Sequence, residues 1–166
     1  SENERDAKLD GPDVESVWDY PRPPAVESCA ARIRVELGGI VVVDSTATMR
    51  VLETSHPPTY YVPLEDVRDE VLAASSRRSY CEFKGTAHYF DVRTGDADAK
   101  DAAWYYPNPT AAFEAIRDHV AFYAHQMDAC YVDGEMVQPQ AGGFYGGWVT
   151  SKVVGPFKGS VGTELW

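Results

Sequence analysis

The clearest structural pattern in the chain reads Arg32-Ile33-Arg34-Val35-Glu36-Leu37, then Gly38-Gly39, then Ile40-Val41-Val42-Val43. The first six residues alternate polar and apolar side chains, which is the period of a half-buried β-strand. The two glycines suit a tight two-residue turn, and the apolar run after them suits a more buried returning strand. The pattern predicts a β-hairpin and, with it, an antiparallel fold.

Further strands are expected on both sides of this hairpin. Asp44-Ser45 predicts a corner that leads into a third strand, so that the chain continues as a meander. Asp133-Gly134 is the strongest hairpin turn signal. Gly95 to Asp101 reads as a polar loop, and Lys84-Gly85 as the turn of another hairpin. The expected strands are Met49–Thr54, Tyr60–Val62, Ser79–Phe83, Thr86–Arg93, Ala102–Tyr106, Val120–Tyr123 and Ala129–Val132.

Two helices are also expected. Leu64, Val67, Val71 and Leu72 recur at the spacing of one helix face, which predicts an amphipathic helix that Pro63 opens. Acidic residues in its first turn and Arg77-Arg78 just beyond its end suit the helix dipole. Thr110 can cap a second, short helix through Ile116. The predicted fold is therefore mainly β, a meander of hairpins with these two helices.

Composition divides the chain into three parts. Residues 1–16 are rich in acids and are expected to be a mobile tail, and residues 17–140 are expected to form a single domain. Residues 141–166 hold seven glycines among five large aromatic residues. We expect this extension to wrap over the sheet or to reach a second subunit, which would give a homodimer. It also contains Phe157-Lys158-Gly159-Ser160, which echoes Phe83-Lys84-Gly85-Thr86, although chance explains four residues better than duplication.

Charge and cysteine content exclude several classes of function. The 166 residues carry 15 basic and 26 acidic side chains, for a net charge of −11, without a basic stripe. Nucleic acids and anionic membranes need clustered Lys and Arg, so neither is an expected partner. The three cysteines show no CxxC spacing. We therefore expect no disulfide framework, no metal and no cofactor, and a cytoplasmic location.

The candidate ligand site combines aromatic residues with a lysine at a turn. A lysine there offers a flexible cation, and a glycine lets a ligand approach the backbone. Nearby aromatic side chains could stack on a flat ligand, which predicts that the domain binds a small anionic or aromatic molecule. The alternative is an ordinary turn lysine with tyrosines packed in the core. The predicted site residues are Tyr60, Tyr61, Lys84, Gly85, Trp104 and Tyr106.

Two other functions are open at this point. Cys81 is a candidate nucleophile for redox or transfer chemistry if a cation favours its thiolate, although free cysteines are usually buried small hydrophobes. The Gly- and aromatic-rich extension could instead make the chain a self-association module. The histidines show no metal-binding spacing.

An ordered series of short motifs carries a family resemblance. It runs from Trp18-Asp19-Tyr20-Pro21 through Tyr60-Tyr61-Val62-Pro63, Cys81-Glu82-Phe83-Lys84-Gly85-Thr86-Ala87 and Trp104-Tyr105-Tyr106-Pro107 to Val120-Ala121-Phe122-Tyr123. With these motifs the chain resembles the family catalogued as domain of unknown function 427. The resemblance implies a β-tent fold, whose relatives often bind zinc with CxxC pairs that this chain lacks.

Some descriptions of this family carry a nucleotidyltransferase label. That chemistry needs two carboxylates for catalytic metals after a Gly-Ser turn. The chain's Asp96-Ala97-Asp98 has no such turn before it, so the sequence does not favour the activity.

Overall fold

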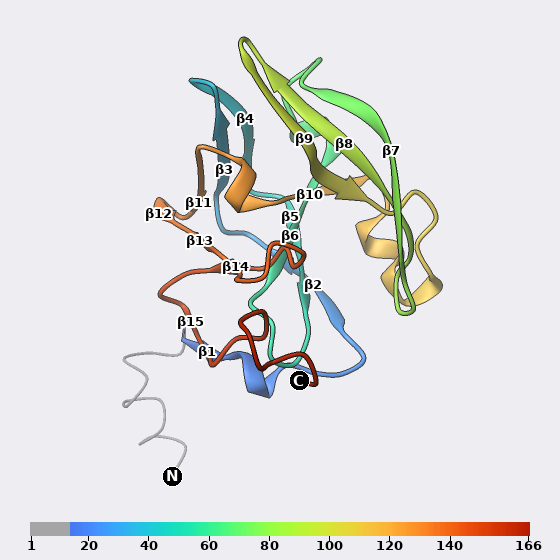
Figure 1. Ribbon diagram of the computed structural model, residues 1–166, viewed down its shortest axis with the longest axis vertical. Coiled ribbons are helices and arrows are strands. Elements are labelled where there is room, and N and C mark those ends of the chain that lie inside the picture. Colours follow the sequence, from blue (N-terminus) through green and yellow to red (C-terminus); the bar gives the residue numbers. More distant parts are fainter. Residues whose placement is uncertain (1–13) are drawn as a thin grey trace.

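Seven strands form the largest sheet of the protein, in the computed structural model that describes residues 14–166 (Figure 1). Neighbouring strands in this sheet pair antiparallel. The prediction of a mainly β chain with antiparallel pairing is thus confirmed. In spatial order the strands are β2 (Ala25–Cys29), β5 (Thr48–Leu52), β6 (Thr59–Pro63), β10 (His119–Phe122), β9 (Ala97–Tyr105), β8 (Gly85–Thr94) and β7 (Leu72–Cys81).

A second sheet has four strands and contains the first predicted hairpin. Gly38 and Gly39 have φ angles of 60° and 76°, the left-handed values that a tight turn between paired strands needs. Ile33, Val35 and Leu37 are buried, as the alternation predicts. In spatial order the strands are β12 (Glu135–Met136), β11 (Ala129–Val132), β3 (Ile33–Leu37) and β4 (Ile40–Ser45).

The predicted meander from this hairpin into the next strand is wrong in its pairing. β5 lies in the larger sheet between β2 and β6, and not beside β4. The chain leaves the smaller sheet at Ser45, whose hydroxyl donates to an Asp66 carboxylate oxygen at 2.5 Å and accepts the Ala47 N–H at 3.1 Å. These bonds fix a corner that carries the chain from one sheet to the other.

The predicted amphipathic helix is also wrong. Only η2 (Leu64–Asp66) is helical there, as a single 3-10 turn, and β7 begins at Leu72. Val67 and Val71 are buried as expected, but not in a helix: Val67 is extended and bridges to Val43, and the Val71 carbonyl, after a turn at Glu70, accepts the Arg93 N–H at 2.8 Å. β-branched valines favour extended backbone, and these partners in other strands override the local helical spacing.

Other short helical segments are 3-10 turns as well. The second predicted helix appears as η3 (Ala111–Ile116), and the Thr110 hydroxyl donates to the Phe83 carbonyl at 2.6 Å instead of capping it. The remaining two are η1 (Val17–Asp19) and η4 (Ala124–Gln126).

The predicted polar loop from Gly95 to Asp101 is mostly strand. β8 turns into β9 at Gly95, which has a φ of 51°, and Ala97 already pairs with Thr94. Asp98 lies 3.1 Å from the Lys100 ammonium and 3.5 Å from the Arg93 guanidinium. These charges gave the segment its loop-like composition, but they lie on the exposed face of a hairpin.

The main core lies between the two sheets, and the C-terminal residues close it. Figure 1 shows the β3–β4 hairpin to one side of the long β7, β8 and β9 strands. Trp148 from β14 (Trp148–Val149) is 1% exposed, and its indole N–H donates to the Phe122 carbonyl at 3.1 Å. β14 pairs with β13 (Gln138–Pro139). Other core side chains are Ile33, Val35, Val43, Val62, Val92, Val120 and Phe122.

The two ends of the described chain meet in one small parallel sheet. β1 (Glu15–Ser16) pairs with β15 (Val153–Val154), and Glu15 forms an ion pair with Arg50 at 3.1 Å. Residues 1–13 of the predicted tail lie outside the described residues, whereas Glu15 and Ser16 form a strand because these contacts hold them. No helix in residues 14–166 is long and apolar enough to cross a membrane.

Candidate ligand-binding site

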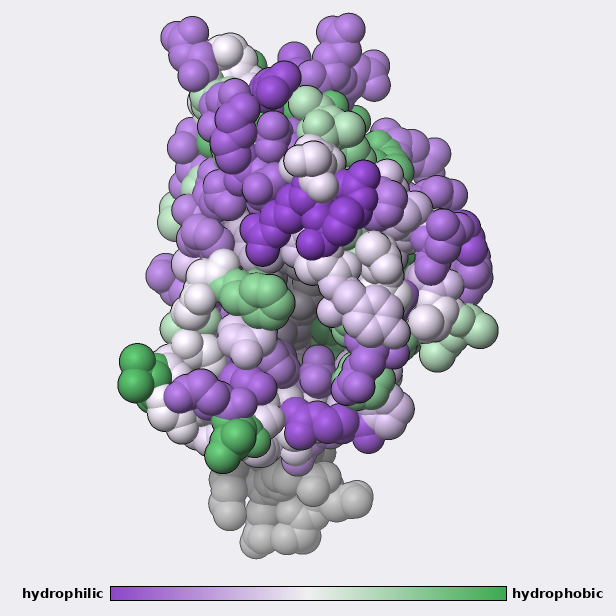
Figure 2. Space-filling view, turned by 45° about the vertical axis from the view of Figure 1, so that its right-hand side comes forward, coloured by the Kyte–Doolittle hydropathy of each residue, from purple (hydrophilic) through white to green (hydrophobic). Residues whose placement is uncertain are grey.

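A cavity of about 330 Å³ opens beside the loop that joins β7 to β8. This volume is within the range of small-molecule sites. Figure 2 shows the surface hollowed near the middle of one face, with apolar and weakly polar side chains around the hollow. The cavity draws aromatic residues from separate hairpins and from the C-terminal segment: Tyr61, Tyr80, Phe83, Tyr89, Trp104, Tyr106, Tyr123, Phe144 and Tyr145.

The structure brings four of the six predicted site residues to this cavity. Tyr61, Lys84, Trp104 and Tyr106 line it. Tyr60 does not, because neighbouring residues on a strand point to opposite faces. Its ring lies 5.2 Å from the Trp148 ring in the main core.

Gly85, the fifth of the predicted residues to be placed, forms part of the turn before β8 and does not line the cavity. Its φ of 109° suits glycine, and it begins β8 at the point where the chain returns from the loop. A side chain added there would meet the Asn108 carbonyl oxygen at 3.3 Å.

The floor of the cavity is a set of buried, uncharged rings. Tyr61 is 1% exposed, and its hydroxyl accepts the Trp104 indole N–H at 3.2 Å. The ring centroids of Trp104 and Tyr123 are 4.5 Å apart. Burial raises the pKa of Tyr61 and of Tyr106 well above the usual value of a phenol. Both phenols therefore stay neutral at physiological pH, and the floor presents ring surface to a ligand.

Lys84 has a fixed backbone at the edge of this floor. Its carbonyl accepts the Thr110 N–H at 3.1 Å, and the neighbouring Phe83 carbonyl accepts the Thr110 hydroxyl. The ammonium nitrogen lies 5.8 Å from the centre of the Tyr106 ring and 5.7 Å from that of Phe113. These are cation–π distances, so the charge is held over the aromatic surface.

Lys158 is a second cation at the cavity that the sequence analysis missed. Its N–H donates to the Ser55 carbonyl at 2.8 Å, and its ammonium nitrogen lies 5.8 Å from the centre of the Tyr145 ring. The one signal in the sequence is the echo between Phe83-Lys84-Gly85-Thr86 and Phe157-Lys158-Gly159-Ser160, which chance alone can explain. The two four-residue segments have different local structures, yet the lysine of each segment lines the same cavity.

The buried amide of Gln140 links three segments around the cavity. Its oxygen accepts the Gly147 N–H at 3.1 Å, and its nitrogen donates to the Lys158 carbonyl at 2.7 Å and to His56 Nδ1 at 3.0 Å. The two backbone partners fix which end of the amide is nitrogen. His56 Nδ1 must therefore accept, and the ring proton lies on Nε2.

The sequence pattern of the family described as domain of unknown function DUF427 matches residues 25–133, which are 109 of the 166 residues. The chain belongs to this family. No curated protein matches the chain.

The C-terminal wall of this DUF427 protein's cavity lies beyond the matched residues. Phe144, Tyr145, Gly146 and Lys158 all line the cavity from outside the family pattern. The Tyr123 hydroxyl donates to the Phe144 carbonyl at 3.0 Å, which ties this wall to the floor. The family pattern thus supplies the floor and Lys84, and the C-terminal segment supplies the opposite side.

Cys81 lines the same cavity of the DUF427 domain and is half-buried. Within residues 14–166, no histidine or lysine nitrogen hydrogen-bonds to its thiol. The thiol therefore lies at the aromatic cavity, and chemistry at Cys81 stays a prediction.

The acidic side chains of residues 14–166 do not gather into a metal site. In the described part of the chain, no three His, Cys, Asp or Glu side chains are grouped to hold a metal ion. Asp98, from the Asp-x-Asp pair, forms its ion pairs on the β8–β9 hairpin.

His56 gives a prediction for the dependence of stability on pH. Burial lowers the pKa of His56 below its ordinary value of 6.5, Lys158 lowers it further, and Glu53 opposes them. The unfolded chain takes up this proton near pH 6.5 while the folded chain does not, so acidification favours unfolding. Urea unfolding at pH 7, 6 and 5 should show a loss of stability below about pH 6.5 that is smaller in His56→Gln. Equal losses in both proteins would contradict this assignment.

Proposed function

We propose that this domain binds a small organic ligand with a flat ring in the aromatic cavity, with Lys84 at the rim. The observation that carries the proposal is a hollow bounded by aromatic side chains from separate hairpins. A flat ring can lie against Trp104 and its neighbours, and each ring contact adds about 0.5–1.5 kcal/mol beyond the area that it buries. The resemblance to β-tent folds, some of which bind ligands in aromatic clefts, supports the proposal by analogy.

The cavity is more consistent with binding than with core packing alone. Its floor rings are buried, but Tyr80 is 76% exposed and Lys84 is half-buried at its edge. An exposed aromatic side chain beside buried rings leaves apolar surface that a ligand can cover. The phenols of Tyr61 and Tyr106 are neutral, so the ammonium group at the rim can orient an acidic group of that ligand.

A thermal-shift screen tests the proposal. Nucleobases and ring carboxylates should raise the melting temperature, since a ligand that binds only the folded state stabilises it, and sugars without a flat ring should not. Tyr80→Ala removes a rim ring without opening a hole in the core, and we expect the affinity to fall about 2- to 10-fold. Trp104→Ala should remove binding.

The matched control is Trp18→Ala, which removes an exposed ring outside the cavity and should leave the affinity unchanged. The absence of any stabilising flat compound would refute the proposed function. So would affinities that survive both Tyr80→Ala and Trp104→Ala.

A further inference from the structure

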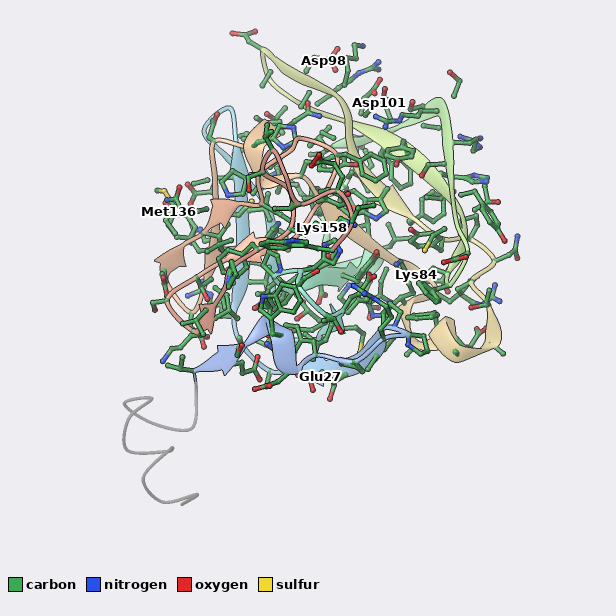
Figure 3. The ribbon with its side chains drawn as sticks, turned by 60° about the horizontal axis from the view of Figure 1, so that its bottom comes forward. Glu27, Lys84, Asp98, Asp101, Met136 and Lys158 are labelled. Atoms are coloured by element: carbon green, nitrogen blue, oxygen red, sulfur yellow. The ribbon has the colours of Figure 1, made fainter. Side chains whose placement is uncertain are left out.

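Two lysines line the same cavity from different segments of the chain. Lys84 comes from the loop between β7 and β8, and Lys158 comes from the C-terminal segment (Figure 3). Among residues 14–166, neither ammonium nitrogen lies within 4.0 Å of a carboxylate oxygen, although seven other basic side chains do. In a protein with a net charge of −11, two cations without an acidic partner at one cavity mark a place for an anion.

Hydrogen bonds hold the backbone of both lysines in place. The Lys84 peptide is fixed by Thr110, and the Lys158 peptide is fixed by Ser55 and Gln140. Each ammonium nitrogen lies 5.8 Å from the centre of an aromatic ring of the cavity, Tyr106 for Lys84 and Tyr145 for Lys158. Anchored groups lose less conformational freedom when a ligand binds, so both lysines are suited to binding.

A neutral donor lies beside Lys158. The His56 and Tyr145 ring centroids are 5.2 Å apart, and Lys158 lies over the same Tyr145 ring. Because Gln140 occupies Nδ1 of His56, the free Nε2–H of this ring is a donor. An acidic group near Lys158 could therefore accept from an ammonium and from an imidazole.

Two carboxylates also line the cavity. Glu53 lies 3.9 Å from the Arg22 guanidinium, so its charge is partly neutralised. Glu82 is exposed to solvent, where water screens it. Among residues 14–166, neither carboxylate lies within 4.0 Å of the Lys84 or Lys158 ammonium nitrogen.

We infer that the ligand is a flat ring with two acidic groups, one bound by Lys84 and the other by Lys158 with the Nε2–H of His56. The inference rests on the proposed binding of a flat ligand and adds its charge. It also assigns a function to the C-terminal segment, which supplies the second cation from beyond the family pattern.

Titration calorimetry with four probes tests the inference. Terephthalate and isophthalate carry two carboxylates on one ring at different separations, benzoate carries one, and terephthalamide carries none. We expect one dicarboxylate to bind wild-type protein about tenfold more tightly than benzoate, since each charge-assisted contact adds on this order. Lys84→Met and Lys158→Met should each reduce this ratio to about one, and Lys152→Met, outside the cavity, should preserve it.

The outcomes separate the two proposals. Binding of terephthalamide as tight as that of both dicarboxylates would overturn the inference and leave the proposed function standing. A ratio that Lys158→Met does not change would also overturn it. Failure of all four probes to bind would overturn the inference, and failure of the nucleobases in the thermal-shift screen as well would overturn the proposed function. The melting temperature of each variant without ligand shows whether it is folded.

Discussion

Trp148→Ala should lower the free energy of unfolding by about 3–5 kcal/mol, the usual cost of removing a buried large aromatic side chain. Its ring is 1% exposed and lies against the Tyr60 ring, and its indole N–H donates to the Phe122 carbonyl at 3.1 Å. The substitution leaves a cavity between the sheets and deprives that carbonyl of its partner. Urea unfolding followed by circular dichroism measures the loss.

Trp18→Ala is the control for this prediction. Trp18 is 43% exposed and packs edge-on against Trp166 at 5.3 Å. Its removal should cost about 0.5–1.5 kcal/mol, the typical value of one aromatic pair. If the two substitutions cost the same, Trp148 does not hold the C-terminal segment to the core.

Gly146→Ala should both destabilise the protein and weaken ligand binding. A Cβ atom at position 146 would lie 2.0 Å from Cη2 of Trp104, far inside any allowed contact. Either the indole moves or the C-terminal segment lifts, and overpacking of this kind costs about 1–3 kcal/mol. Because Trp104 lies in the floor of the cavity, we expect ligand affinity to fall at least about tenfold, as for loss of one strong contact.

A double-mutant cycle identifies the clash as the cause. In a Trp104→Phe background the smaller ring leaves room for the new methyl group, so Gly146→Ala should cost much less than in wild-type protein. The comparison needs unfolding curves for the wild type, both single variants and the double variant. An equal cost in both backgrounds would show that the glycine is needed for another reason.

The sequence predicted those parts of the fold that local chemistry determines. The Gly38-Gly39 turn and the alternation before it defined the β3–β4 hairpin, because both features act over a few residues. The helix expected from Leu64 to Leu72 failed because its apolar spacing is equally satisfied by an extended segment with partners from β4 and β8. Those partners lie far away in sequence, and no local pattern reports them.

The candidate site was predictable in its floor and not in its C-terminal wall. Tyr61, Lys84, Trp104 and Tyr106 were found because they fall within motifs of the family. Tyr60 does not line the cavity, and the sequence did not show which of two adjacent tyrosines faces it. Lys158 lies more than 70 residues from Lys84 along the chain, and only the fold brings it there.

The indole N–H signals of the four tryptophans in a ¹H–¹⁵N NMR spectrum test the central claim most directly. Trp104 lines the cavity and donates to Tyr61, whereas the Trp18 indole donates to the Pro156 carbonyl outside it. The account predicts that terephthalate or terephthalamide at high concentration shifts the Trp104 signal, assigned with Trp104→Phe, and leaves that of Trp18 in place. A Trp104 signal that stays unmoved with both compounds would contradict it.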